Sequence, residues 1–103
     1  MGRRLDLQNI LESLLPDGKK YVYFQPPGST IMQYPCITYH RDAANTKFAN
    51  DKPYGQVRRY QVTIIDADPD SEIPAKVGFL ARTSFQRFFV SDKLNHDIYT
   101  IYF

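Results

Sequence analysis

The stretch Gln56–Asp66, QVRRYQVTIID, decides the fold. Within it Tyr60, Val62 and Ile64 fall on one side of an extended chain, and polar residues alternate with them on the other side. This period of two predicts a strand that is buried on one face. A second stretch, Tyr34–Asp42 (YPCITYHRD), is rich in β-branched and aromatic residues and predicts the neighbouring strand. We therefore expect the two stretches to form the centre of a sheet.

Hydrophobic spacing and turn-forming residues predict the remaining elements. Apolar residues at helical spacing predict a helix over Leu5–Leu15, which Pro16 and Gly18 end, and a short strand follows at Lys20–Gln25. The acidic run Asp66–Glu72 predicts the entry to a second helix, because Asp70 or Ser71 can accept hydrogen bonds from its first free N–H groups. The apolar face of that helix comprises Ile73, Val77, Leu80, Ala81, Phe85 and Phe88, and Gly78 within it suggests close approach to the sheet. The chain then gives a strand at Phe88–Ser91, a turn at Asp92–His96 and a strand at Asp97–Phe103.

These elements run in the order α-β-β-β-α-β-β. Such an order predicts an α+β fold, with two helices packed on a mostly antiparallel sheet. The length of 103 residues predicts one domain, residues 1–103, that is large enough to bury its own core.

The segment Ala43–Gly55 (AANTKFANDKPYG) is predicted to be a long polar loop between the two central strands. Its sequence places aromatic residues next to charged ones, which favours a contact surface that becomes ordered on binding; the other interpretation is a solvated arm without a partner. The candidate interface residues in and just after this segment are Lys47, Phe48, Asp51, Lys52, Tyr54, Arg58 and Arg59.

The closing strand, Asp97–Phe103, is apolar on both faces. Strands of this kind are buried on both sides or pair with another chain. Its candidate interface residues are Tyr99, Ile101 and Phe103.

Composition limits the classes of function. The net charge of +2 is too small to indicate a nucleic-acid partner without a concentrated basic patch. The single cysteine, Cys36, cannot form an internal disulfide and is expected to be a buried, inert thiol. No apolar run is long enough to span a bilayer, and no secretory signal follows Arg3 and Arg4. We expect a reduced, soluble protein made in a cytoplasm.

Catalytic and metal chemistry find little support in the sequence. Asp66, Asp68 and Asp70 have the initial spacing of a calcium loop, but Ser71 and Val77 stand where such a loop needs Gly and Glu. We therefore interpret the run as a helix-capping turn. Cys36 and His40 would lie roughly 13 Å apart along a strand, too far for activation of the thiol. We predict no enzyme, with no catalytic residues, no metal site and no cofactor.

Nucleic-acid binding is the competing class. Basic residues, among them Arg58 and Arg59, interleave with aromatic residues that could stack on bases. These aromatic residues could equally pack within the sheet, namely Tyr21, Tyr23, Tyr39 and Tyr60. The Gly-aromatic consensus of the RNA-recognition module is missing from the sequence.

Three segments, which together with the first helix extend over nearly the whole chain, resemble the tail terminator or tail completion proteins of long-tailed bacteriophages. They are YPCITY at Tyr34–Tyr39, RRYQVTIIDADPDSEIP at Arg58–Pro74 and FVSDKLNHDIYTIYF at Phe89–Phe103. The motifs are structural patterns, and no catalytic signature accompanies them.

The resemblance implies a subunit of a ring, usually a hexamer, that caps the tail tube, ends its polymerisation and offers a surface to the head connector. It implies an α+β domain without a cofactor, assembled in the bacterial cytoplasm and located in the virion tail. Nucleic acid would be met only as it passes through the ring. A head-closure or neck role in the same virion remains an alternative. Under this hypothesis Asp97–Phe103 is an intersubunit edge and Ala43–Gly55 is an arm that reaches a neighbour or the tube.

Overall fold

The computed structural model describes residues 4–18, 20–49 and 52–103, and for residues 17, 43–49 and 52–57 it describes the backbone alone. The elements along the chain are α1 (Arg4–Ser13), a 3-10 turn η1 (Pro16–Gly18), β1 (Val22–Phe24), β2 (Cys36–Ala49), β3 (Lys52–Asp66), α2 (Ile73–Gly78), β4 (Thr83–Ser91) and β5 (Leu94–Tyr102). The five strands form one sheet in the order β1-β2-β3-β5-β4. Only β1 and β2 pair in parallel; the other pairs are antiparallel. The predicted α+β fold and its order α-β-β-β-α-β-β are confirmed.

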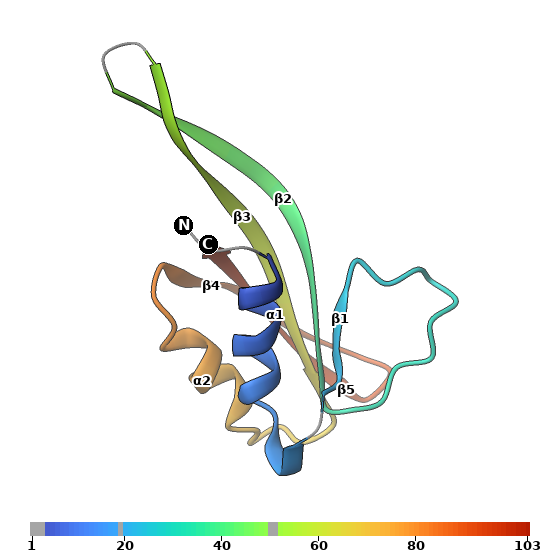
Figure 1. The fold of residues 1–103 in the computed structure, drawn as a ribbon. Helices are drawn as coiled ribbons and strands as arrows, with labels where there is room; N and C mark the ends of the chain where they lie inside the picture. Colours follow the sequence, from blue (N-terminus) through green and yellow to red (C-terminus); the bar gives the residue numbers. More distant parts are fainter. Residues whose placement is uncertain (1–3, 19, 50–51) are drawn as a thin grey trace.

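Both helices lie on the same face of the sheet (Figure 1). The predicted alternation in β3 is confirmed, since Tyr60, Val62 and Ile64 are all at most 2% exposed and point toward the helices. Leu7 of α1 and Val77 of α2 are fully buried in the same cluster. The core is therefore the layer between this one face and the two helices.

Helix α1 follows the predicted amphipathic pattern, with bounds within two residues of those expected. Leu7 and Leu11 are one turn apart and fully buried, so the helix lies flat on the sheet. Gly18, with φ of 67°, ends the turn η1 in a left-handed conformation that other residues rarely adopt. The chain then enters β1, where Val22 lies beside Ile37 of β2 in a parallel pair.

The predicted loop at Ala43–Gly55 is wrong for most of its length. Strands β2 and β3 continue as a paired ribbon from Ala43, opposite Arg59, to Ala49, opposite Lys52. This ribbon projects well beyond the core (Figure 1), and the molecule extends 51 Å along its longest axis against 25 and 23 Å across. We call residues 43–57 the arm. The ladder shifts register between Lys47 and Phe48, next to a proline that cannot donate to a regular ladder.

The second predicted helix is much shorter than expected. Helix α2 ends at Gly78, and the predicted helical positions Phe85 and Phe88 belong to strand β4. Gly78 does approach the sheet, because a Cβ atom there would lie 3.4 Å from Cε2 of Tyr99. The predicted close contact at this glycine is confirmed.

The hairpin β4–β5 closes the sheet. Its turn is tighter than the predicted segment Asp92–His96, because Ser91 already pairs with Leu94. The two turn residues Asp92 and Lys93 have φ of 52° and 63°, the left-handed conformation of a type I′ turn, which suits the twist of the strands.

Candidate interaction surfaces

The predicted interface residues of the arm are divided between its two strands. Lys47 and Phe48 lie in β2, Lys52 and Tyr54 lie in β3, and Asp51 falls outside the described residues. Beyond Arg59 the hairpin leaves β5. The arm is thus a two-stranded ribbon with a row of backbone hydrogen-bonding groups along each side.

Arg58 and Arg59 lie at the base of the arm on opposite faces of β3. Arg59 Nε donates to a carboxylate oxygen of Asp42 at 2.8 Å, and both side chains are partly exposed. This hydrogen bond, together with one involving Tyr102, raises the pKa of the Arg59 guanidinium. Arg58 is exposed, and its carbonyl accepts the backbone N–H of Phe103 at 2.9 Å. The two arginines therefore cannot act as one patch.

The closing strand is not an edge, so the prediction of Asp97–Phe103 as an intersubunit edge is wrong. Strand β5 pairs with β3 on one side and with β4 on the other. Ile101 is 2% exposed and is part of the core. Tyr99 packs edge to face against Phe85 with 5.4 Å between the ring centres. Of the two readings of a doubly apolar strand, burial within the sheet is the one observed.

Strand β4 takes the edge position that was predicted for β5. It pairs only with β5 among the described strands and lies at the end of the sheet opposite β1 (Figure 1). The large apolar side chains of this strand remain open to solvent: Phe85 is 53% exposed, Phe88 51%, Phe89 36% and Val90 59%. Phe85, Phe88 and Val90 lie on the helix-covered face of the sheet and Phe89 lies on the other face. We call these four residues of the edge strand the β4 patch. A long edge strand with exposed apolar side chains is a site at which another chain can pair.

Neighbouring groups hold part of the β4 patch in place. The ring of Phe89 stacks on that of His96 with 4.5 Å between centres, and the guanidinium of Arg87 lies 5.1 Å from the centre of the Phe89 ring. Phe85 is held by Tyr99 on the helix-covered face. The patch is therefore partly ordered before any partner arrives.

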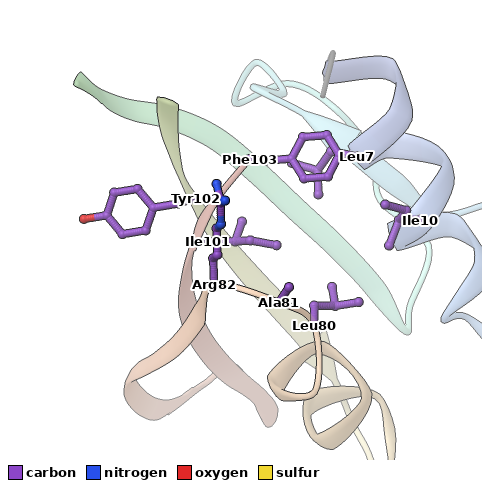
Figure 2. A pocket seen from close by; sticks show the side chains of 8 residues that line it. All are labelled: Leu7, Ile10, Leu80, Ala81, Arg82, Ile101, Tyr102 and Phe103. Atoms are coloured by element: carbon purple, nitrogen blue, oxygen red, sulfur yellow. The ribbon is translucent and has the colours of Figure 1, made fainter. Parts of the chain in front are cut away.

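An apolar groove of about 270 Å³ lies between α1 and the segment that follows α2 (Figure 2). Its lining comprises Leu7, Ile10, Leu80, Ala81, Arg82, Ile101, Tyr102 and Phe103. The predicted residues Ile101 and Phe103 thus come together here. A groove of this size and apolar character can accept one or two apolar side chains of a partner.

A polar hollow of about 340 Å³ lies on the face of the sheet that the helices leave open. Its lining comprises Asp42, Arg59, Gln61, Ser84, Gln86, Arg87, Ile98, Thr100 and Tyr102. Two arginines and a tyrosine at one hollow can contact an anion, although Asp42 already engages Arg59.

The acidic run forms turns, as predicted. Asp66 Oδ1 accepts the N–H of Asp68 at 3.0 Å, and Asp68 Oδ1 accepts that of Asp70 at 2.9 Å. Ser71 Oγ accepts the N–H of Ile73 at the start of α2. No group of three or more His, Cys, Asp or Glu side chains that could hold a metal ion occurs among the described residues.

Cys36 is fully buried. Burial, and to a lesser degree the charge of Asp66, raises the pKa of its thiol to about 12, so the thiol is protonated at neutral pH. His40, on the same strand, is exposed. Cys36 is thus the inert, buried thiol that the sequence predicts.

Within residues 4–18, 20–49 and 52–103, no helix is both long and apolar enough to cross a membrane. Comparison of the sequence with protein-family models and with curated proteins finds no match.

Proposed function

We propose that this chain is a structural subunit of a long-tailed bacteriophage, a tail terminator that assembles into a ring at the end of the tail tube. The observation that carries the proposal is the pair of open strand edges at the two sides of one sheet. One is β4 with its apolar patch; the other is the side of β2 beyond its short pairing with β1.

Two different edges on one subunit suit a head-to-tail assembly. When each copy offers one edge and receives the other, the contact is heterologous, and it closes into a ring if the rotation between copies permits. We propose a hexamer, following the resemblance of Tyr34–Tyr39, Arg58–Pro74 and Phe89–Phe103 to terminator proteins. The arm supports the same proposal because it extends beyond the core, where it can reach a neighbouring copy or the tube (Figure 1).

In this function the partners are the tail tube protein on one side of the ring and the head connector or head-closure protein on the other. Genomic DNA would pass through the ring. A head-closure or neck role in the same virion uses the same self-assembly and differs in the partner that binds.

The decisive experiment measures the mass of the purified protein alone and with tail tube protein. We expect a ring, and we expect it to bind tube ends and limit further growth of tubes in an assembly reaction. A strict monomer that leaves tube growth unchanged would refute the proposal. Binding to connector but not to tubes would favour the head-closure alternative.

The polar hollow favours a second candidate function, the binding of single-stranded nucleic acid. It places Arg59, Arg87 and Tyr102 on an open sheet face, where phosphates and bases could be contacted. Binding should then fall steeply with salt and weaken on Arg87→Ala. Arg58→Ala is the matched control, because Arg58 lies on the opposite face of β3.

A further inference from the structure

We infer that strand β4 of one copy pairs with the open edge of strand β2 in a second copy, so that the sheet continues from subunit to subunit. This inference deepens the proposed ring by naming the two edges that meet, and it depends on that proposal only for closure of the ring.

The β4 patch offers a large part of the apolar area that a stable contact needs. A phenylalanine side chain can bury about 150–250 Å², and the exposures of Phe85, Phe88, Phe89 and Val90 are 53%, 51%, 36% and 59%. Together they leave roughly 400 Å² to be covered, about half of the ~800 Å² that each partner buries in an interface of standard size. Backbone groups and polar side chains of the nine-residue strand can supply the rest.

The occupant that fits is a strand, because among the described strands β4 pairs with β5 alone, which leaves the backbone donors and acceptors of its other side without a strand partner. Apolar side chains accompany them. Addition of a strand satisfies both requirements at once. A strand of a second copy is available without any further partner.

Pairing of β4 with its own equivalent is disfavoured. Arg87 is the central residue of the nine-residue strand Thr83–Ser91. An antiparallel pair about a twofold axis, in full register, therefore sets Arg87 opposite Arg87 of the second copy. Like charges directly opposite each other destabilise a strand pair.

Pairing of β4 with the edge of β2 does not place Arg87 opposite Arg87. Strand β1 pairs only with Ile37, Thr38 and Tyr39, so the ten residues from His40 to Ala49 have no neighbour on that side within the described part of the chain. This length matches the nine residues of β4. The β2 edge also lies at the opposite end of the sheet from β4 (Figure 1). Successive copies can therefore join head to tail, with β4 of each copy beside β2 of the next.

The test uses two variants, one directed at each edge: the first adds a charge to β4, and the second removes residues 45–49, half of the open β2 edge. Val90→Lys places a charge in the β4 patch at a position that is already 59% exposed, so the fold should tolerate it. The second variant replaces residues 45–57 by Asn-Gly, which joins Ala44 to its pairing partner Arg58 through a tight turn. Ile31→Lys is the control, because Ile31 is 88% exposed and lies between β1 and β2, away from β4.

Mass measurement at matched concentrations gives the result. We expect the wild-type chain, of 12.0 kDa per copy, and Ile31→Lys to assemble, and each edge variant alone to remain at the mass of its own single chain. Mixing the two edge variants should restore a complex of one copy of each, since one keeps β2 and the other keeps β4. Phe88→Lys gives a second, independent variant of the β4 edge, which preserves the test if Val90→Lys fails to fold.

Three results would overturn the inference: a wild-type chain that is monomeric at about 100 μM, assembly that survives both β4 variants, or an arm-shortened chain that assembles like the wild type. The last would mean that β4 meets a surface other than β2. If the wild type assembles through these edges but does not bind tail tubes, the inference stands and the proposed function fails. If the protein caps tubes while both β4 variants still assemble, the proposed function stands and the inference fails.

Discussion

The hydroxyl of Tyr39 in β2 donates to the side-chain oxygen of Gln8 in α1, and this hydrogen bond ties the first helix to the centre of the sheet. Arg4 Nη1 donates to the same hydroxyl at 3.1 Å. Gln8 Nε2 in turn donates to the carbonyl of Val22 at 3.1 Å, so one glutamine connects α1, β1 and β2. Tyr39 is 1% exposed, which makes these polar contacts part of the core.

Tyr39→Phe should therefore destabilise the protein by about 1–2 kcal/mol, because a part-buried oxygen of Gln8 loses its donor while the ring packing is kept. Urea denaturation measures the loss. Tyr34→Phe is the control, since Tyr34 is 42% exposed and its variant should unfold like the wild type. Equal stability of the two variants would show that the hydroxyl of Tyr39 contributes nothing.

Gly78 allows a second prediction. A Cβ atom at this position would meet the Tyr99 ring at 3.4 Å, the near limit of ordinary contact. Gly78→Ala should be tolerated and should raise the free energy of unfolding by up to about 0.5–1 kcal/mol, because alanine loses less backbone freedom in a helix. Gly78→Leu should lower it, because the larger side chain displaces Tyr99 from Phe85. Denaturant midpoints of the two variants on opposite sides of the wild type would confirm this; a shift in the same direction would contradict it.

Cys36 gives the protein an alkaline instability. The pKa of its thiol is about 12 in the folded chain against an ordinary value of 9.0, so folding favours the protonated form. The stability due to this difference is fully present below pH 9 and is lost as pH rises from 9 toward 12. The free energy of unfolding should fall more steeply between pH 8.5 and 10.5 in the wild type than in Cys36→Ala. Parallel curves for the two proteins would contradict the prediction. Tyrosines with raised pKa, such as Tyr39 and Tyr99, affect both proteins alike.

The salt bridge at the base of the arm leads to a local prediction. Arg59 Nε lies 2.8 Å from Asp42 Oδ1, but both side chains are partly exposed. The ion pair should therefore add little to the free energy of unfolding. Asp42→Asn should instead speed amide exchange at the base of the arm, at whichever of the residues Ala43 and Ala44 directs its N–H toward β3, while exchange in the core stays unchanged. Glu72→Gln is the control, because Glu72 is an exposed carboxylate directly before α2, beyond the end of β3 that lies opposite the arm. Unchanged exchange at the base of the arm would show that the ladder alone fixes it.

Much of this fold could be predicted because the alternation of apolar and polar residues in its central strand, β3, is visible in the sequence alone. Tyr60, Val62 and Ile64 alternate with polar residues, and the core residues Leu7 and Leu11 lie one helical turn apart. Each pattern is local, and tertiary packing agrees with it. The fold class follows from the order of such segments.

A β-bulge explains why the sequence predicted a helix where strand β4 lies. Phe85 pairs with Tyr99 and Phe88 with Asp97, but the ladder shifts between Phe85 and Arg87, so β4 contains one extra residue. Phe85 and Phe88 therefore share a face of the sheet at a spacing of three, the spacing expected of a helix. The β-prone run Phe88–Val90 was the available signal against a helix.

The candidate surface was harder to predict than the fold. Which strand forms the edge depends on the order of strands in the sheet, and the sequences of β4 and β5 do not reveal that order. Both strands carry apolar residues at consecutive positions, Phe88–Val90 in β4 and Ile98–Tyr99 in β5, and so on both faces. The arm escaped prediction for a related reason. The arm projects beyond the core (Figure 1), and no alternation of apolar residues marks it as a strand. Its pairing extends the ladder of Cys36–Tyr39 against Val62–Ile65 after a register shift between Arg41 and Ala43.

The arm should be dispensable for folding. The core cluster lies between the two helices and the sheet, and it contains no residue of the arm. Tyr60 is the buried core residue of β3 nearest the arm. Deleting Lys47–Lys52, or replacing residues 45–57 by Asn-Gly, removes a two-stranded ribbon that encloses none of these side chains. We expect the thermal midpoint of the shortened chain to stay within a few degrees of the wild type, since every residue of the core cluster is kept. Assembly should weaken at the same time. A chain that loses both its cooperative transition and its assembly would show that the arm is needed to fold β2 and β3, and the loss of assembly would then follow from unfolding.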